Sequence, residues 1–166
     1  MNARSLKGLT MNLLNSGILA GTTTTYTITT TTRCLINGKY ATAIAAASNI
    51  ANVTTDINTG AAFVAMVDNQ ECVFVIGQPV AGVAMQVAQG SIVDTLAGVT
   101  TTPGAAINVY AQFPNLPDNF CPLAYCVVKT APSSSGFTWG TTAFDTSGID
   151  DTWVDIGVLP DRPQVS

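Results

Sequence analysis

The sequence of 166 residues contains no histidine. This absence excludes a Ser-His-Asp triad, a Cys-His pair and a histidine-ligated metal, and it removes the side chain that most often moves protons at neutral pH. The phosphate-binding glycine patterns GxxxxGKS/T and GxGxxG are also missing. We therefore expect a protein that is not an enzyme, with no catalytic residue, no bound metal and no cofactor.

Charge is scarce as well, since 10% of the residues are charged against roughly 25% in typical soluble domains. The net charge of −4 disfavours a nucleic-acid partner, because phosphate backbones attract basic surfaces. The longest apolar runs, at 61–67 and 72–76, are far shorter than the roughly 20 residues of a membrane helix, so we expect no membrane contact. A surface this poor in charge indicates apolar contacts with partner proteins rather than a monomer that makes none.

The four cysteines show no CxxC spacing. Because tetrahedral zinc sites in proteins without histidine need closely spaced cysteine pairs, a zinc site is not expected. We interpret the cysteines as small buried thiols of a protein made in a reducing compartment. They are Cys34, Cys72, Cys121 and Cys126.

The few charges are divided unevenly along the chain. The first 40 residues have a net charge of +4 (four basic, no acidic), and the rest have −8 (two basic, ten acidic). Within the basic part, apolar residues at helical spacing predict a short amphipathic helix, which Gly8 and Gly17 weaken. We expect residues 1–32 to form an anchoring arm, helical or extended, and residues 33–166 to form a single β-rich body.

The body has the pattern of short strands separated by turns. The threonine-rich residues 22–32 favour a strand or extended arm, and Asn37-Gly38 predicts a tight hairpin between 34–36 and 39–41. A second hairpin is expected from 61–67 and 72–76. Further strands are expected at 83–87, 91–96, 107–113, 123–129, 137–139 and 153–158. Together they predict an all-β fold, either an antiparallel β-sandwich or a jelly-roll-like barrel.

Two clusters in the C-terminal part have alternative interpretations. Carboxylates could bind calcium, but their spacing does not follow a calcium-loop pattern, so solvated turn residues are favoured; they are Asp145, Asp150, Asp151 and Asp155. Aromatic side chains could form a platform for a glycan, but core packing is favoured. These aromatic residues are Tyr110, Phe113, Phe120, Tyr125, Trp139, Phe144 and Trp153.

Three segments resemble a pattern found in virion structural proteins of tailed bacteriophages. They are FPNLPDNFCPLAYCVV at 113–128, FTWGTTAFDTSGI at 137–149 and the hairpin CLINGKYATA at 34–43. The family's usual glycine before the tyrosine of the first segment is replaced here by Ala124. The resemblance covers roughly residues 33–150.

The resemblance implies a capsid decoration (cement) or head-fibre protein that is β-rich, commonly trimeric and anchored to the virion by its N-terminal segment. We therefore expect a structural protein of the capsid surface, made in the host cytoplasm, whose partners are the major capsid protein and further copies of itself as a homotrimer. The alternative is a fibre or tail module that recognises a host-surface glycan. The residues expected to contact the capsid or neighbouring subunits are Arg4, Leu6, Lys7, Leu9, Leu13, Leu14 and Ile18.

Overall fold

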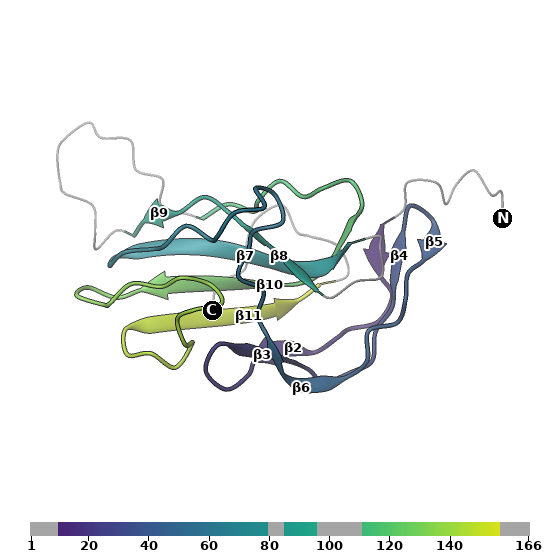
Figure 1. Ribbon diagram of the computed structural model, residues 1–166, viewed down its shortest axis with the longest axis horizontal. Helices are drawn as coiled ribbons and strands as arrows, with labels where there is room; N and C mark the ends of the chain where they lie inside the picture. Colours follow the sequence, from purple (N-terminus) through teal and green to yellow (C-terminus); the bar gives the residue numbers. More distant parts are fainter. Residues whose placement is uncertain (1–9, 80–84, 96–110, 157–166) are drawn as a thin grey trace.

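The computed structural model describes residues 10–79, 85–95 and 111–156 of the chain. Every regular element among them is a β-strand, and all pairs between these strands are antiparallel (Figure 1). The prediction of an antiparallel all-β fold is thus confirmed. None of the described residues belongs to a helix long and apolar enough to cross a bilayer.

The largest sheet runs along the length of the molecule and has the order β11-β10-β7-β8, with β9 also pairing with β7. Its two long central strands, β7 and β10, are buried on both faces, as their nearly continuous apolar sequences predict. The five strands are β7 (Gln70–Pro79), β8 (Gln86–Gln89), β9 (Val93–Asp94), β10 (Phe120–Thr130) and β11 (Ile149–Asp155).

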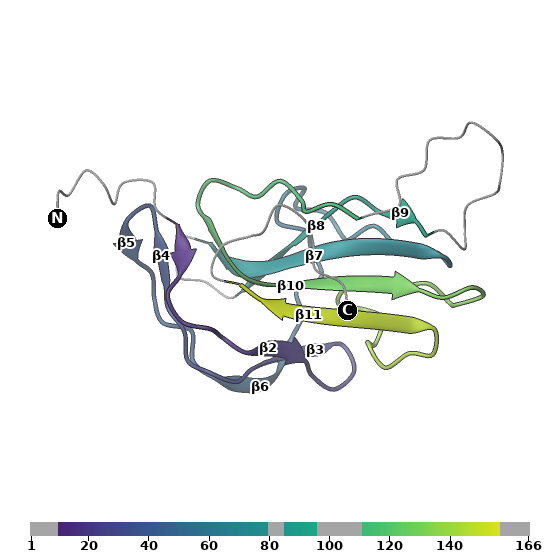
Figure 2. The same cartoon turned by 180° about the vertical axis from the view of Figure 1, so that it is seen from behind.

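Two three-stranded sheets complete the fold. The order β1-β4-β5 forms one sheet at an end of the long axis, and β2-β3-β6 forms the other beside β11 (Figures 1 and 2). These strands are β1 (Met11–Asn12), β2 (Ile18–Ala20), β3 (Thr25–Ile28), β4 (Cys34–Ile36), β5 (Lys39–Tyr40) and β6 (Ala47–Ala51).

Apolar clusters cover both faces of the central sheet. On one face, side chains from β2, β3 and β4 join the aromatic residues of the loops around 63–66 and 137–144 against β7 and β10. On the other face, a smaller cluster includes Val73, Tyr125 and Val127, with Phe113 and Leu116 packed against it. The central sheet is therefore the middle layer of a sandwich-like arrangement.

A proline and a glycine lie opposite each other where β7 meets β10. Pro122 pairs with Gly77, and the register shifts by one residue before Ala124. A proline cannot donate to the ladder and is tolerated in a sheet at such an irregularity. A Cβ atom on Gly77 would lie 2.2 Å from the carbonyl oxygen of Cys121, so this close approach of the two backbones requires glycine.

The predicted Asn37-Gly38 hairpin is confirmed. It joins β4 to β5, and Asn37 and Gly38 have positive φ angles of 51° and 75°. These are the left-handed conformations that a two-residue hairpin turn of this kind needs, and both residue types tolerate them. The interpretation of the four cysteines as buried thiols is also confirmed, since all are free and buried.

The helix predicted in the N-terminal segment is wrong over the residues that the structure describes. Residues 10–18 contain strand β1, an irregular stretch and the start of β2. The backbone turns at Gly17, whose φ is +58°, and Ile18 pairs with Ile28. Ile18, Tyr26 and Ile28 belong to the core. Pairing with distant strands overrides the local leucine periodicity here.

The second predicted hairpin is wrong as well. Residues 61–67 form only isolated bridges, from Ala62 to Thr55 and from Met66 to Phe137. The side chain of Gln89 bonds to the backbone of Val64 in place of a partner strand. Its Oε1 accepts from Val64 N and its Nε2 donates to Val64 O, at 2.8 Å each. The other half of the expected hairpin, 72–76, is the centre of β7 and pairs with β10 and β8.

The smaller predicted strands are only partly present. Strand β8 is shifted from the segment expected at 83–87, and β9 is shorter than the segment expected at 91–96. Strand β11 starts earlier than the expected residue 153. Residues 137–139 contribute one bridge rather than a strand. Of the segment 107–113, only residues 111–113 are described, and they are not in a strand.

Candidate interface

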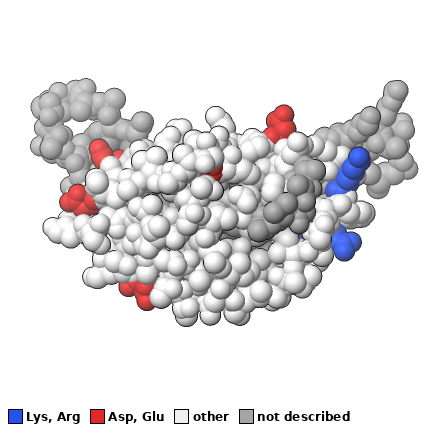
Figure 3. All heavy atoms as spheres, viewed as in Figure 1, with Lys and Arg blue, Asp and Glu red and all other residues white. Residues whose placement is uncertain are grey.

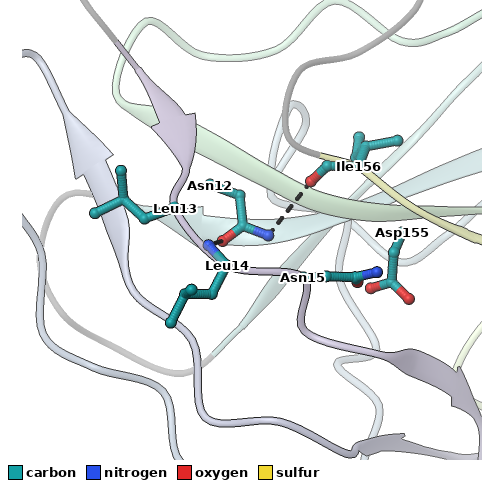
Figure 4. Close-up of a pocket in the computed structure, with 6 residues that line it drawn as sticks. All are labelled: Asn12, Leu13, Leu14, Asn15, Asp155 and Ile156. Carbon is teal, nitrogen blue, oxygen red and sulfur yellow. Dashed lines mark hydrogen bonds between the residues drawn. The ribbon is translucent and has the colours of Figure 1, made fainter.

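A hollow of about 280 Å³ lies between the N-terminal segment and the end of β11 (Figure 4). Half of the residues that line it are polar and half are apolar. The lining residues are Asn12, Leu13, Leu14, Asn15, Asp155 and Ile156.

Asn12 holds the N-terminal side of this hollow in place. Its side chain is buried, its Nδ2 donates to the carbonyl oxygen of Ile156 at 3.3 Å, and its Oδ1 accepts from Thr32 Oγ1 at 2.7 Å. Thr32 Oγ1 also lies 2.7 Å from the carbonyl oxygen of Leu14. A buried amide with all these partners fixes the backbone at 12–14 against both β11 and the segment before β4.

Asp155 fixes the next part of the segment. Its Oδ1 accepts hydrogen bonds from Ser16 Oγ at 2.8 Å and from the backbone N–H of Ile18 at 3.0 Å. Hydrogen bonds to a carboxylate are stronger than those between neutral groups. The start of β2 is therefore anchored on the end of β11.

This anchoring directs two leucines outward. Leu13 is 38% exposed and Leu14 is 57% exposed, although the backbone that carries them is held by buried polar groups. Exposed leucines on a fixed backbone form a preorganised apolar surface, because little conformational freedom remains to be lost on contact. We call Leu13 and Leu14 the leucine rim.

The structure brings only part of the predicted contact set together. Leu13 and Leu14 are adjacent and exposed, as an interface requires, but Ile18 is 2% exposed and packs in the core. Ile18 is thus a structural residue that a partner cannot reach, which corrects the expectation. The other four predicted contacts, Arg4, Leu6, Lys7 and Leu9, lie outside the described residues.

Two basic side chains and an exposed aromatic lie near the same end of the molecule. Arg33 precedes β4, and Lys39 and Tyr40 form β5, whose side chains are exposed. Figure 3 shows the visible Lys and Arg side chains at this end and a mostly uncharged surface elsewhere on that face. This end therefore combines apolar and positively charged groups.

The described aromatic residues of the C-terminal part lie in the core or pack against it, as favoured from the sequence, and Tyr110 lies outside the described residues. Trp139 is fully buried, stacks on Phe74 with ring centroids 4.7 Å apart, and meets Phe144 edge-on at 5.3 Å. Trp153 is half-buried and packs against both Trp139 and Phe144. A ring with no exposed surface cannot stack on a sugar, so Trp139 is unavailable to a glycan.

The acidic residues near the C-terminus are not gathered into a cation site. Among the described residues, no group of three or more His, Cys, Asp or Glu side chains is placed to hold a metal ion. Asp155 is engaged with the N-terminal segment, and Asp151 accepts a hydrogen bond from Trp153 Nε1. Burial raises the pKa of Asp151 above its ordinary value. The hydrogen bond from Trp153 lowers this pKa in part, and the charge of neighbouring Asp150 raises it further.

Sequence reasoning missed the roles of Asn12 and Asp155. Asn12 is a polar residue between apolar neighbours in the N-terminal segment, and Asp155 is one of several acids near the C-terminus. Their partners are 144 and 137–139 residues away along the chain, so no local pattern reveals the contacts. Comparison of the chain with protein-family models, curated proteins and solved structures finds no match.

Proposed function

We propose that this chain is a non-enzymatic structural protein of a tailed-bacteriophage virion. It decorates and stabilises the capsid surface through contacts with the major capsid protein and with copies of itself. The leucine rim and the basic N-terminal residues beyond it form the contact surface in this proposal.

The sequence resemblance supports the virion part of the proposal. The segments that carry it lie at 34–43, 113–128 and 137–149. In the fold they supply the β4–β5 hairpin, strand β10 and the loop whose Phe137, Trp139 and Phe144 fill the main core. The resemblance therefore falls on elements that determine the fold rather than on isolated surface residues.

The leucine rim is the observation that carries the assembly part. Leu13 and Leu14 are exposed on a backbone fixed by Asn12, whereas Ile18, a few residues further on, is buried in the core. Burial of apolar surface at a contact contributes about 25 cal/mol per Å². A repeated surface lattice can use many copies of such a small contact.

The first test is the amount of this protein in purified particles, measured by quantitative mass spectrometry relative to the major capsid protein. Near-stoichiometric copies are expected for a decoration protein. A small fraction of that number would replace the proposal with a fibre, neck or tail location, and absence from particles would refute the virion assignment.

A matched pair of variants tests the contact surface. We expect Leu14→Asp to weaken binding to capsids lacking this protein, because it places a charge in an apolar contact. Val67→Asp is the control, since Val67 is 58% exposed and precedes the start of β7. That end of β7 lies at the opposite end of the molecule from β4 (Figure 1). Equal binding of both folded variants in co-sedimentation would refute the leucine rim as the contact.

A further inference from the structure

The turn between β2 and β3 holds a threonine in a conformation that its side chain disfavours. Five non-glycine residues in the described ranges have a positive φ, and Thr23, with a φ of 59°, is the only β-branched residue among them. For a β-branched residue this left-handed conformation is a genuine outlier, and such strain persists only where the surrounding structure imposes it. The β2–β3 turn is therefore strained.

The sequence around this turn favours an extended chain over a reversal. Nine of the residues 22–32 are threonines, whose branched side chains fit an extended strand. The turn between β4 and β5 has Asn37-Gly38, two residue types that tolerate positive φ angles. The β2–β3 turn places a threonine in the left-handed conformation instead, so its residues suit an extended connection better than a closed turn.

The segment before the turn, residues 10–20, is held by contacts with later parts of the chain. Strand β1 pairs with β4, and β2 pairs with β3. The side chain of Asn12 donates to the carbonyl oxygen of Ile156, and the Asp155 carboxylate accepts from the backbone N–H of Ile18. Because these partners all lie beyond the turn in the sequence, the same segment of another copy can make the same contacts.

We propose that residues 10–20 are exchanged between copies of this chain, so that the segment of one copy packs on the body of another. In the exchanged form the turn opens into an extended connection, Ile18 enters the core of the neighbouring copy, and the strain at Thr23 is released. Short hinge loops under strain favour such domain swapping. The inference specifies how copies hold one another, and it does not depend on the virion assignment because the purified protein tests it.

Hydrogen bonds oppose the opening of the turn in a folded monomer. The N–H of Phe144 donates to the carbonyl oxygen of Thr23 at 3.1 Å, and the N–H of Thr22 donates to Asn49 Oδ1 at 2.9 Å. The closed and exchanged forms share the contacts of the segment itself, so their balance depends on the turn and on the protein concentration. We therefore expect exchange to occur while chains fold together at high concentration.

A disulfide placed across β2 and β3 reports which copy supplies the segment. Leu19 and Thr27 are directly opposite each other, and neither side chain is buried. The Cα atoms of such partners are about 4.5–5.5 Å apart, a separation that a disulfide can span. The Leu19→Cys/Thr27→Cys variant is refolded from urea under reducing conditions at low and at high concentration and separated by size. Each folded fraction is then oxidised with oxidised glutathione and analysed by non-reducing electrophoresis.

We expect the oligomer from the concentrated sample to give links between chains, and the monomer from the dilute sample to give links within the chain. A two-fold exchange yields covalent dimers, and a three-fold ring yields covalent trimers. Leu19→Cys alone is the matched control and should stay unlinked, because the four native cysteines are buried. Oligomers linked only within chains, or refolding to monomers alone at the high concentration, would overturn the proposal.

Variants of the turn test the proposal without added cysteines. Thr23→Gly accepts a positive φ without strain, so it should lower the oligomer fraction several-fold at the concentration used for the wild-type protein. Thr24→Gly is the matched control, since it adds the same flexibility at a residue that has no positive φ. Equal oligomer fractions of the two variants, measured by size-exclusion chromatography with light scattering after refolding, would overturn the proposal. This comparison decides the question even if the double cysteine variant does not fold.

Discussion

Replacing Trp139 by alanine should strongly destabilise the fold. The side chain is completely buried, and its ring contacts five other aromatic rings. Their centroids lie 4.7–6.5 Å from that of Trp139, and they belong to Phe63, Phe74, Phe137, Phe144 and Trp153. Removing a buried tryptophan costs about 3–5 kcal/mol of unfolding free energy through lost burial and the cavity left behind.

The environment of the indole N–H refines this estimate. Trp139 Nε1 is buried and has no hydrogen-bond partner among the described residues, and an unpaired buried donor costs about 1–3 kcal/mol. Trp139→Phe removes this cost while keeping much of the ring, so it should lose less than half as much stability as Trp139→Ala. Tyr40→Ala removes an exposed ring and should change stability by less than about 0.5 kcal/mol.

Urea unfolding followed by far-ultraviolet circular dichroism measures these differences without relying on tryptophan fluorescence. For a chain of this size, the loss in Trp139→Ala corresponds to a fall in Tm of roughly 6–20 °C. A loss below about 1 kcal/mol in a folded Trp139→Ala variant would refute the assignment of this ring to the core. If that variant does not fold, the comparison of Trp139→Phe with Tyr40→Ala remains.

Two further substitutions test particular contacts. Gly77→Ala should destabilise the protein by more than about 2 kcal/mol, measured by urea unfolding, because the new methyl group would collide with the backbone of Cys121; an unchanged midpoint would contradict the close approach. Asp151→Asn should stabilise the protein at neutral pH. Because the pKa of Asp151 is raised on folding, the folded protein becomes less stable as pH rises from the ordinary carboxyl pKa through the pKa in the folded state. The amide oxygen of asparagine carries no charge and can still accept the hydrogen bond from Trp153. In thermal melts across this pH range, the Tm advantage of Asp151→Asn over the wild-type protein should grow as pH rises. A constant difference in Tm would contradict the raised pKa of Asp151.

The parts of the fold that the sequence predicts well are those with local signals. The apolar runs of β7 and β10 identify buried strands, and Asn37-Gly38 identifies a turn, because each pattern reports a conformation or burial that neighbouring residues determine. The helix expected before Ile18 fails for the same reason. Leucine spacing is a local signal, whereas the conformation there depends on pairing with Arg33, Cys34 and Ile28.

The sequence predicts which residues of the candidate interface are apolar but not which of them are exposed. Leu13 and Leu14 could be selected as apolar residues in a basic segment, but their exposure depends on the bonds that Asn12 and Asp155 make across the chain. Ile18 has the same residue character as its neighbours and lies in the core. The distinction between contact and core residues comes from the fold and not from residue type.

Strand β6 shows how the protein manages an edge with very little charge. No charged residue occurs between Lys39 and Asp56, and β6 is the last strand of its sheet in the described structure. Such an edge invites pairing with another chain unless charges, prolines or bulges disturb it. Here β6 has an extra residue opposite β3, with Asn49 at a φ of 54° and its Oδ1 accepting from Thr22 N at 2.9 Å. Because this bulge interrupts the regular edge, the scarcity of charge along β6 does not make it a strand-pairing surface. The leucine rim is therefore the stronger candidate for contact with other subunits.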